Sequence, residues 1–346
     1  MKIGLLTYHT SVSYGATLQT YATCRILQKL GHEVELIDFR LDEEPSLLYK
    51  IAFFCKDHDT HKLWKRVYPK RSKYYPDMSS LQNAKMDYDC LMVGSDQTWN
   101  PDISRDKCLA YFLNFGPDKI KRVSYASSFG VATWPDKYQR LVPEIKRLLG
   151  RFDSLSTREE AGQKLLKKVF GYDAQIVLDP TLLIDDFSEL SGPIDDNGML
   201  NAFIMNRSDD QLKRVLELGK SMNKKPVMTS TIFPYRGFSY RYPPTIGKWL
   251  RYIGGADFVV VDSFHALVFC LKYQRQFMVI TPDNGLNSRL QTLLHIVGLD
   301  DRFYYDTDKD IPYLSLVNSP INYEKVEKKL SIEIEKSILY LTKNLS

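Results

Sequence analysis

The chain has 346 residues, of which 44% are hydrophobic and 26% charged, and its formal net charge is +5. This length suggests about two domains, and the mild charge does not by itself indicate a nucleic-acid partner. No apolar run approaches the roughly 20 residues that cross a bilayer, and the strand-like start is too short for a signal peptide. The five scattered cysteines form no disulfide or zinc pattern, which fits reduced thiols in a cytoplasm.

The first third of the chain alternates strands and helices. We predict a strand at 2–7, a helix from Gly15 to Leu30 that ends at Gly31, and a strand at 34–38, which together form a βαβ unit of a parallel sheet. Further strands are expected at 90–93, 122–126, 152–156 and 174–178, and helices at 137–149 and 159–169.

A loop-rich stretch at 191–198 separates this half from a second alternating half. There we expect strands at 200–205, 226–230, 258–261 and 277–280, and helices at 211–221, 245–253, from His265 onward and at 287–297. The pattern predicts two Rossmann-like, doubly wound α/β domains, residues 1–188 and 189–320. Residues 321–346 are predicted to form a helix that packs back on the first domain.

A basic and aromatic insertion occupies residues 45–82. Eight lysines and arginines lie between Lys50 and Lys73, and aromatic residues interleave with them. Such a segment could meet anionic lipid headgroups or a polyanionic ligand. The alternative, which we favour, is a pair of amphipathic helices whose solvated face is basic.

The corner after the strand at 258–261 is the most informative stretch. A β-branched run ends at Asp262 and Ser263, either of which can cap the next helix, and His265 then falls in the first helical turn. Helix N-termini favour anions, so an imidazole there suits acid/base work on a phosphorylated or carboxylated substrate. The alternative is a capped helix whose histidine packs on the sheet.

Other strand-to-helix corners also carry polar residues. The segment Gly94–Asn100 places several polar residues around Trp99. This arrangement suits a sugar whose ring stacks on the indole, although Trp99 could instead be a core residue. Arg158 follows the strand at 152–156, where it could clamp an anion or form a local salt bridge. The loop from Tyr8 to Gln19 lacks the GxGxxG and Walker patterns, so it indicates neither a dinucleotide nor a triphosphate site.

Taken together, these corners resemble the polysaccharide pyruvyl transferase family. The matching pieces are Tyr14-Gly15-Ala16-x-Leu18-Gln19, Gly94-Ser95-Asp96-Gln97-x-Trp99-Asn100, Ser124-Tyr125-Ala126-x-Ser128-Phe129-Gly130, Ser156-x-Arg158-Glu159, Asp179-Pro180-Thr181, Asp262-Ser263-Phe264-His265-Ala266, and Ser288-Arg289-Leu290 with Gly298-Leu299. The chain departs from many relatives at two positions, with Ser263 in place of an arginine and Ser13 in place of an asparagine. Which groups replace that arginine stays open.

The resemblance implies a two-domain fold like that of the GT-B glycosyltransferases, with the acceptor on the first domain and the donor on the second. The implied reaction moves the pyruvyl group of phosphoenolpyruvate onto sugar hydroxyls as a ketal and releases phosphate, in the biosynthesis of surface polysaccharides. The acceptor would be a sugar or a lipid-linked oligosaccharide. We expect the enzyme to be cytoplasmic, and whether it associates with the inner face of the membrane stays open. We expect no metal, no other cofactor and no nucleic-acid partner.

The expected site residues have three roles. The catalytic pair is His265 and Asp96. The donor would be bound by Arg158, Ser263, Asp262 and Arg289. The acceptor would be bound by Tyr14, Gly15, Gln19, Ser95, Gln97, Trp99 and Asn100. Two other functions remain open: a GT-B-type glycosyltransferase that uses a nucleotide sugar, and a non-catalytic glycan- or lipid-binding protein.

Overall fold

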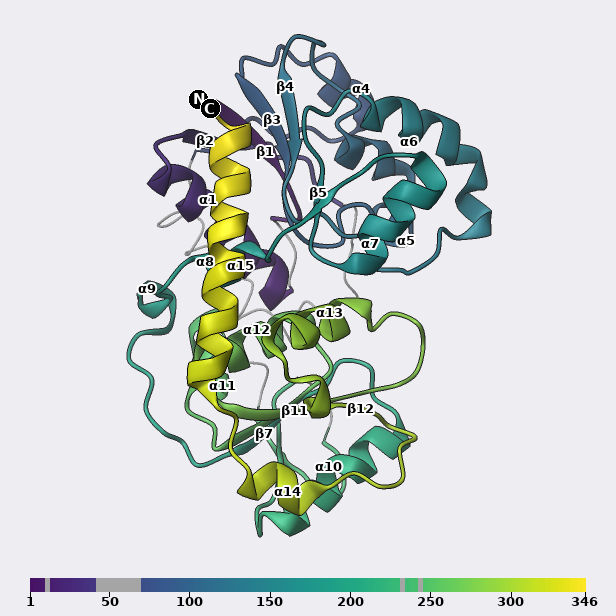
Figure 1. Cartoon of the computed structure of the whole chain (residues 1–346). Helices are drawn as coiled ribbons and strands as arrows, with labels where there is room; N and C mark the ends of the chain where they lie inside the picture. The colour runs from purple at the N-terminus through teal and green to yellow at the C-terminus, as the bar shows by residue number, and fades with distance from the viewer. Residues whose placement is uncertain (10–12, 42–69, 231–233, 242–244) are drawn as a thin grey trace. The chain divides into compact units, whose positions relative to one another are not determined.

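The structure, a computed structural model, describes residues 1–9, 13–41, 70–230, 234–241 and 245–346 (Figure 1). These residues form two compact units. The first unit comprises the described residues of 1–184 together with Ser331–Ser346, and the second comprises those of Asp185–Leu330. Most of the basic and aromatic insertion, residues 45–69, lies outside the described residues.

The first unit is built on parallel strands in the order β2-β1-β3-β4. Its strands are β1 (Lys2–Leu6), β2 (Glu33–Leu36), β3 (Cys90–Val93), β4 (Lys121–Ser124), β5 (Ser156–Thr157) and β6 (Gln175–Ile176). Bridges from Val123 to Ser154 and from Ser127 to Thr157 continue the parallel pairing from β4 to the short β5-β6 pair. Its helices are α1 (Tyr14–Lys29), α4 (Met78–Gln82), α5 (Pro101–Ser104), α6 (Val142–Leu149), α7 (Glu160–Leu165) and α8 (Pro180–Leu183).

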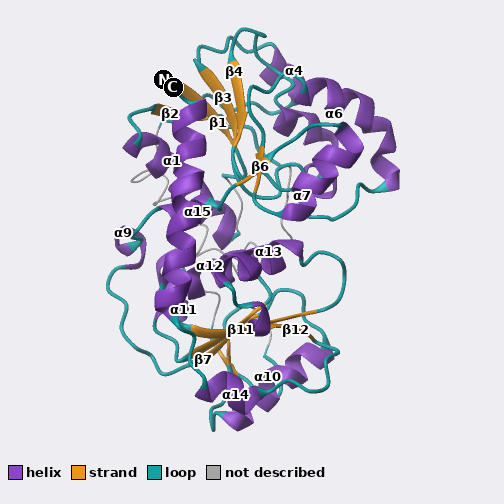
Figure 2. Cartoon of the chain, in the orientation of Figure 1, coloured by secondary structure: helices purple, strands orange, loops and turns teal. Residues whose placement is uncertain are grey.

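Helices lie on both sides of this sheet (Figure 2). The first of them, α1, begins where the Ser13 side chain accepts a hydrogen bond from the amide of Ala16, and it ends just before Gly31, which has a φ of +86°. A residue without a Cβ adopts such an angle at little cost, so Gly31 stops the helix and turns the chain toward β2.

The second unit contains a parallel sheet in the order β12-β11-β10-β7-β8-β9. Its strands are β7 (Leu200–Phe203), β8 (Val227–Met228), β9 (Ser239–Tyr240), β10 (Phe258–Val261), β11 (Gln276–Thr281) and β12 (Phe303–Tyr305). Its helices are α9 (Ser188–Ser191), α10 (Asp209–Ser221), α11 (Ile246–Gly254), α12 (Phe264–Lys272), α13 (Ser288–Val297) and α14 (Tyr313–Asn318). Counted along the unit, this is the 3-2-1-4-5-6 order of Rossmann domains, in which ligands bind at the carboxyl ends of the strands beside the reversal point. Here the reversal lies between β7 and β10.

The last helix, α15 (Tyr323–Asn344), returns the chain from the second unit to the first. The side chain of Ser337 accepts a hydrogen bond of 2.9 Å from the amide of Leu178, and the hydroxyl of Tyr340 donates one of 2.9 Å to the carbonyl of Ser124. Both contacts are buried, and they satisfy backbone groups at the ends of β6 and β4. The prediction that the C-terminal helix packs on the first unit is therefore confirmed.

Candidate functional site

At the reversal point of the second unit, Asp262 joins the loops that follow two strands. Its carboxylate accepts hydrogen bonds of 2.8 Å from the amide of Met205 and 2.7 Å from the amide of Asn206, just after β7. Burial raises the pKa of Asp262, and these two backbone hydrogen bonds oppose that rise. Both carboxylate oxygens thus hold the loop after β7 against the end of β10. Asp262 thus positions the two loops, and its expected contact with the donor stays a prediction.

His265 lies in the first turn of α12, three residues after Asp262 along the chain. Ser263 occupies the N-cap position with extended backbone angles, but its side chain makes no capping hydrogen bond. His265 is 8% exposed, and its ring packs edge-on against that of Phe264 with centroids 5.3 Å apart. Because α12 begins at the carboxyl edge of the sheet, the imidazole shares that edge with the positive end of a nine-residue helix.

A second helix begins at the same edge. Asn287 precedes α13, and its side chain is buried, accepting a hydrogen bond of 3.0 Å from the hydroxyl of Thr281 and donating one of 2.8 Å to the carbonyl of Pro282. These two hydrogen bonds hold the turn after β11 in place. Arg289 follows in the first turn of α13. The edge therefore combines two helix N-termini, an imidazole and a guanidinium, which is chemistry suited to an anion.

In the first unit, Asp96 follows β3 in a strained conformation. Its φ is +87°, unusual for a residue with a Cβ, and its side chain is 13% exposed. The carboxylate accepts hydrogen bonds of 2.8 Å from the amide of Gln97 and 3.2 Å from Arg158. Asp96 is thus an oriented carboxylate that solvent can still reach, as a general base requires.

Arg158 lies among three carboxylates. Its side chain is fully buried, 3.0 Å from Asp179, 3.2 Å from Asp96 and 3.8 Å from Glu159. Burial lowers the pKa of this guanidinium, but the attraction of the three carboxylates outweighs burial and leaves the pKa above its usual value. The structure therefore favours the local ion pair, the alternative left open by the sequence, over a donor clamp.

Trp99 lies in the core of the first unit. It is fully buried, its indole N–H donates a hydrogen bond of 2.9 Å to the carbonyl of Tyr111, and its ring stacks on Phe112 with centroids 5.6 Å apart. A ring packed in this way presents no open face to a sugar, so the core alternative explains Trp99 better. Its burial instead anchors the loop that carries Asp96 and Gln97.

The partly exposed Gln97 and the buried Asn100 are joined within this loop. The amide of Asn100 donates a hydrogen bond of 3.0 Å to the side-chain oxygen of Gln97, and the oxygen of Asn100 caps α5 through the amide of Asp102. Gly130 makes room for this pair, because a Cβ there would lie 1.9 Å from the Gln97 oxygen.

The remaining expected acceptor residues are buried. Ser95 donates a hydrogen bond of 2.7 Å to Asp179, and the fully buried Gln19 donates one of 2.9 Å to the hydroxyl of Thr7. Tyr14 and Gly15 open α1, and both are buried. These residues position the ends of β1 and β3, while Asp96 and Gln97 are the partly accessible members of the expected set in this unit.

Two buried carboxylates that sequence reasoning did not assign to the site, Asp179 and Glu159, hold it together. Asp179 accepts from Arg158, Ser95 and Thr181, and Glu159 accepts a hydrogen bond of 2.8 Å from Ser128. The sequence feature that could have indicated them is their position shortly after the predicted strands at 174–178 and 152–156, in the segments Asp179-Pro180-Thr181 and Arg158-Glu159. In the part of the chain that the structure describes, no three His, Cys, Asp or Glu side chains are grouped as metal ligands, and no helix is both long and apolar enough to cross a membrane.

Comparison with known proteins identifies both the fold and the family. The UDP-GlcNAc 2-epimerase from Neisseria meningitidis, bound to UDP-GlcNAc, matches with a TM-score of 0.53 and 11% identity over 98% of this chain and 100% of that chain. The UDP-GlcNAc 2-epimerase from Methanocaldococcus jannaschii, in complex with UDP-GlcNAc and UDP, has a TM-score of 0.51 and 11% identity over 96% and 93%. LpCGTa in complex with UDP has a TM-score of 0.56 and 10% identity over 99% and 98%.

These neighbours confirm the GT-B-like, two-domain α/β class. No curated protein matches the sequence. The model of the polysaccharide pyruvyl transferase family, however, matches residues 14–284, more than half of the chain. The match spans the strained Asp96 loop of the first unit and the His265 corner of the second. The chain therefore belongs to the polysaccharide pyruvyl transferase family, a family of transferases.

Proposed function

We propose that the protein transfers the pyruvyl group of phosphoenolpyruvate to two hydroxyls of a sugar, forming a ketal. The observation that carries the proposal is the family match together with the position of His265, in the first turn of α12 at the reversal point of a Rossmann sheet. Phosphoenolpyruvate brings a carboxylate and a phosphate. The N-termini of α12 and α13 and the guanidinium of Arg289 would neutralise them.

The reaction balances with two proton transfers. One sugar hydroxyl attacks the central carbon of phosphoenolpyruvate, whose methylene gains a proton and becomes a methyl group. The second hydroxyl then displaces phosphate from the same carbon, and the phosphate leaves with the second proton. His265 would move a proton at the donor, and Asp96 would accept one from the acceptor hydroxyl, with Gln97 orienting the sugar. Arg158 and Asp262 would act as positioning residues that hold the two loops.

The test is phosphate release and product mass with phosphoenolpyruvate and a panel of sugar acceptors. His265→Ala is expected to lower kcat by about 100- to 10,000-fold, the usual contribution of a positioned acid/base group. His295→Ala is the matched control, because His295 is an exposed histidine of the same unit, with a side chain 75% exposed. Both variants should keep the wild-type circular dichroism spectrum. Equal turnover of His265→Ala and wild type would remove His265 from the mechanism.

A glycosyltransferase that uses a nucleotide sugar is the competing function, since two of the similar structures hold UDP-GlcNAc. Calorimetric titration separates the two, because a pyruvyl transferase should bind phosphoenolpyruvate and not UDP-GlcNAc. Binding of UDP-GlcNAc alone, with transfer of its sugar, would overturn the proposal. The third function, a non-catalytic lipid- or glycan-binding protein, was suggested by the basic and aromatic insertion at residues 45–82. Most of that insertion lies outside the described residues, and no contact among the described residues favours this function.

A further inference from the structure

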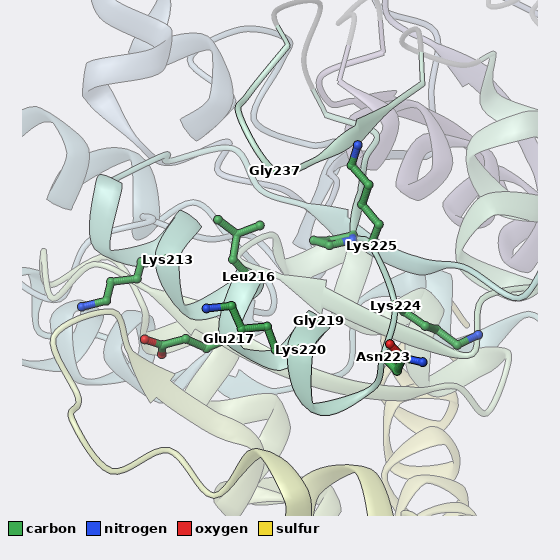
Figure 3. A pocket seen from close by; sticks show the side chains of 10 residues that line it. Lys213, Leu216, Glu217, Gly219, Lys220, Asn223, Lys224, Lys225 and Gly237 are labelled. Carbon is green, nitrogen blue, oxygen red and sulfur yellow. The ribbon is translucent and has the colours of Figure 1, made fainter.

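A groove of about 580 Å³ lies at the edge of the second unit opposite to His265. It is formed by the C-terminal half of α10, the turn that leads into β8, and Gly237 just before β9 (Figure 3). These segments precede their strands, whereas His265 follows one, so the groove and the proposed donor site occupy opposite ends of the same sheet.

Two glycines let the segments that form the groove pack closely against one another. A Cβ at Gly219 would lie 2.7 Å from the carbonyl of Lys224, and one at Gly237 would lie 2.9 Å from Leu216. Gly237 also has a φ of +89°, which disfavours any other residue. Leu216 and Pro226 supply an apolar lining.

The charge of the groove is positive and partly uncompensated. Lys213, Lys220 and Lys225 are exposed, and none of them forms an ion pair with any described residue. The other charges are matched: Lys224 pairs with Asp257, and Glu217 accepts hydrogen bonds of 3.1 Å from Arg214 and 2.9 Å from Tyr313. Figure 3 shows Lys213 and Lys220 on one side of Leu216 and Lys225 on the other. The groove therefore has lysines on two sides of its apolar lining.

We propose that this groove binds the acidic, already pyruvylated part of the acceptor glycan. The inference rests on the proposed function, because each ketal adds one carboxylate to the product, so a chain becomes more acidic as the reaction proceeds. Ammonium groups are point charges that accept single carboxylates without a fixed geometry. A hollow suits a chain better than a flat lipid surface, and none of the ten described lining residues is an aromatic that could stack a nucleobase. Holding the modified part would keep the chain on the enzyme between transfers.

The test is calorimetric binding of oligogalacturonate, a carboxylate-bearing oligosaccharide, and of a neutral galactose oligomer of equal length. The wild-type protein is expected to bind the acidic oligomer and not the neutral one, and to bind more weakly in 200 mM than in 50 mM salt. The triple variant Lys213→Gln, Lys220→Gln, Lys225→Gln should bind about tenfold more weakly, since each exposed ion pair contributes a few-fold. The matched control, Lys85→Gln, Lys119→Gln, Lys168→Gln, removes three exposed lysines of the first unit and should bind like wild type.

Equal affinity of the groove variant and wild type would overturn the proposal, and so would an equal loss in the control variant. Binding to anionic phosphatidylglycerol vesicles without binding to oligogalacturonate would assign the surface to a membrane instead. Turnover of a monosaccharide acceptor, which is too short to reach the groove, should be the same in the groove variant and wild type. If wild-type protein bound the acidic oligomer through these lysines but transferred no pyruvyl group, the proposed function would fail while the groove assignment stood.

Discussion

The guanidinium of Arg158 lies between Asp96, Asp179 and Glu159 in a part of the first unit that excludes water. A charge in this position organises the carboxylates around it, because each would otherwise repel the others at short range. Only Asp96 among them is partly exposed, so the cluster directs one carboxylate outward while the other two stay inside. Residue chemistry alone left an anion clamp and a local salt bridge open here, since the partners stand up to 62 positions away along the chain.

Arg158→Met should therefore lower the free energy of unfolding much more than it changes donor binding. Removing one partner of a buried ion pair typically costs about 3–5 kcal/mol, because the remaining charges are left without compensation. We expect urea unfolding to show a loss of this size, and the KM for phosphoenolpyruvate to change little in the fraction that folds. A large rise in KM with an unchanged free energy of unfolding would show instead that Arg158 contacts the donor.

At the scale of elements, the loop after β3 depends on a glycine in the loop after β4. Gly130 has a φ of +70°, and a Cβ there would lie 1.9 Å from the side-chain oxygen of Gln97 and 2.9 Å from the side-chain nitrogen of Asn100. A side chain at position 130 would therefore force the ends of the Gln97 and Asn100 side chains to move. The hydrogen bond between Gln97 and Asn100 sits at this contact.

Gly130→Ala is expected to displace the Gln97 side chain and weaken acceptor binding, in addition to its backbone strain. Gly31→Ala is the matched control, because Gly31 also has a positive φ but nothing lies within 4 Å of its added Cβ. The control should lose about 1 kcal/mol of stability and no activity. Gly130→Ala should lose more stability and raise the KM for the acceptor. Matching losses in the two variants would mean that the contact with Gln97 is unimportant.

The sequence predicted the buried central elements well and the edges poorly. β3 and β10 have the predicted bounds, because a parallel strand buried on both faces forms an unbroken apolar run. β9 was missed, since its two residues carry no such run and it pairs only with β8 at the edge of the sheet. The positive φ of Asp96 and the partners of Arg158 depend on tertiary contacts that no local pattern records.

At the scale of the whole molecule, the partly buried Lys272 links stability to pH. Burial lowers the pKa of Lys272, at the end of α12, to about 8, while Asp185 and Asp186 oppose the change. Its ammonium lies 5.6 Å from the centre of the Phe187 ring. The unfolded chain, where the pKa is near its usual value, binds more protons than the folded protein between about pH 8 and pH 10. The contribution of Lys272 to stability should therefore rise with pH across this window.

Lys272→Met should remove this dependence. At pH 7 the variant is expected to be as stable as wild type or more so, by up to about 3 kcal/mol, because the cost of burying the charge disappears. The measurement is the urea unfolding of wild type, Lys272→Met and the exposed-lysine control Lys248→Met at pH 7.5 and pH 9.5. Wild type and the control should gain stability relative to Lys272→Met at the higher pH. Parallel behaviour of all three proteins would contradict the assignment.

The return of α15 to the first unit also sets an order of events during synthesis on the ribosome. The second unit is continuous over its described residues, so it can fold as soon as Leu330 has emerged. The first unit is completed later, because Ser337 and Tyr340, which satisfy the backbone of Leu178 and Ser124, follow the second unit along the chain. Of the two units, the one whose translation begins earlier is thus completed later, and a nascent chain stalled before residue 337 would carry it incomplete.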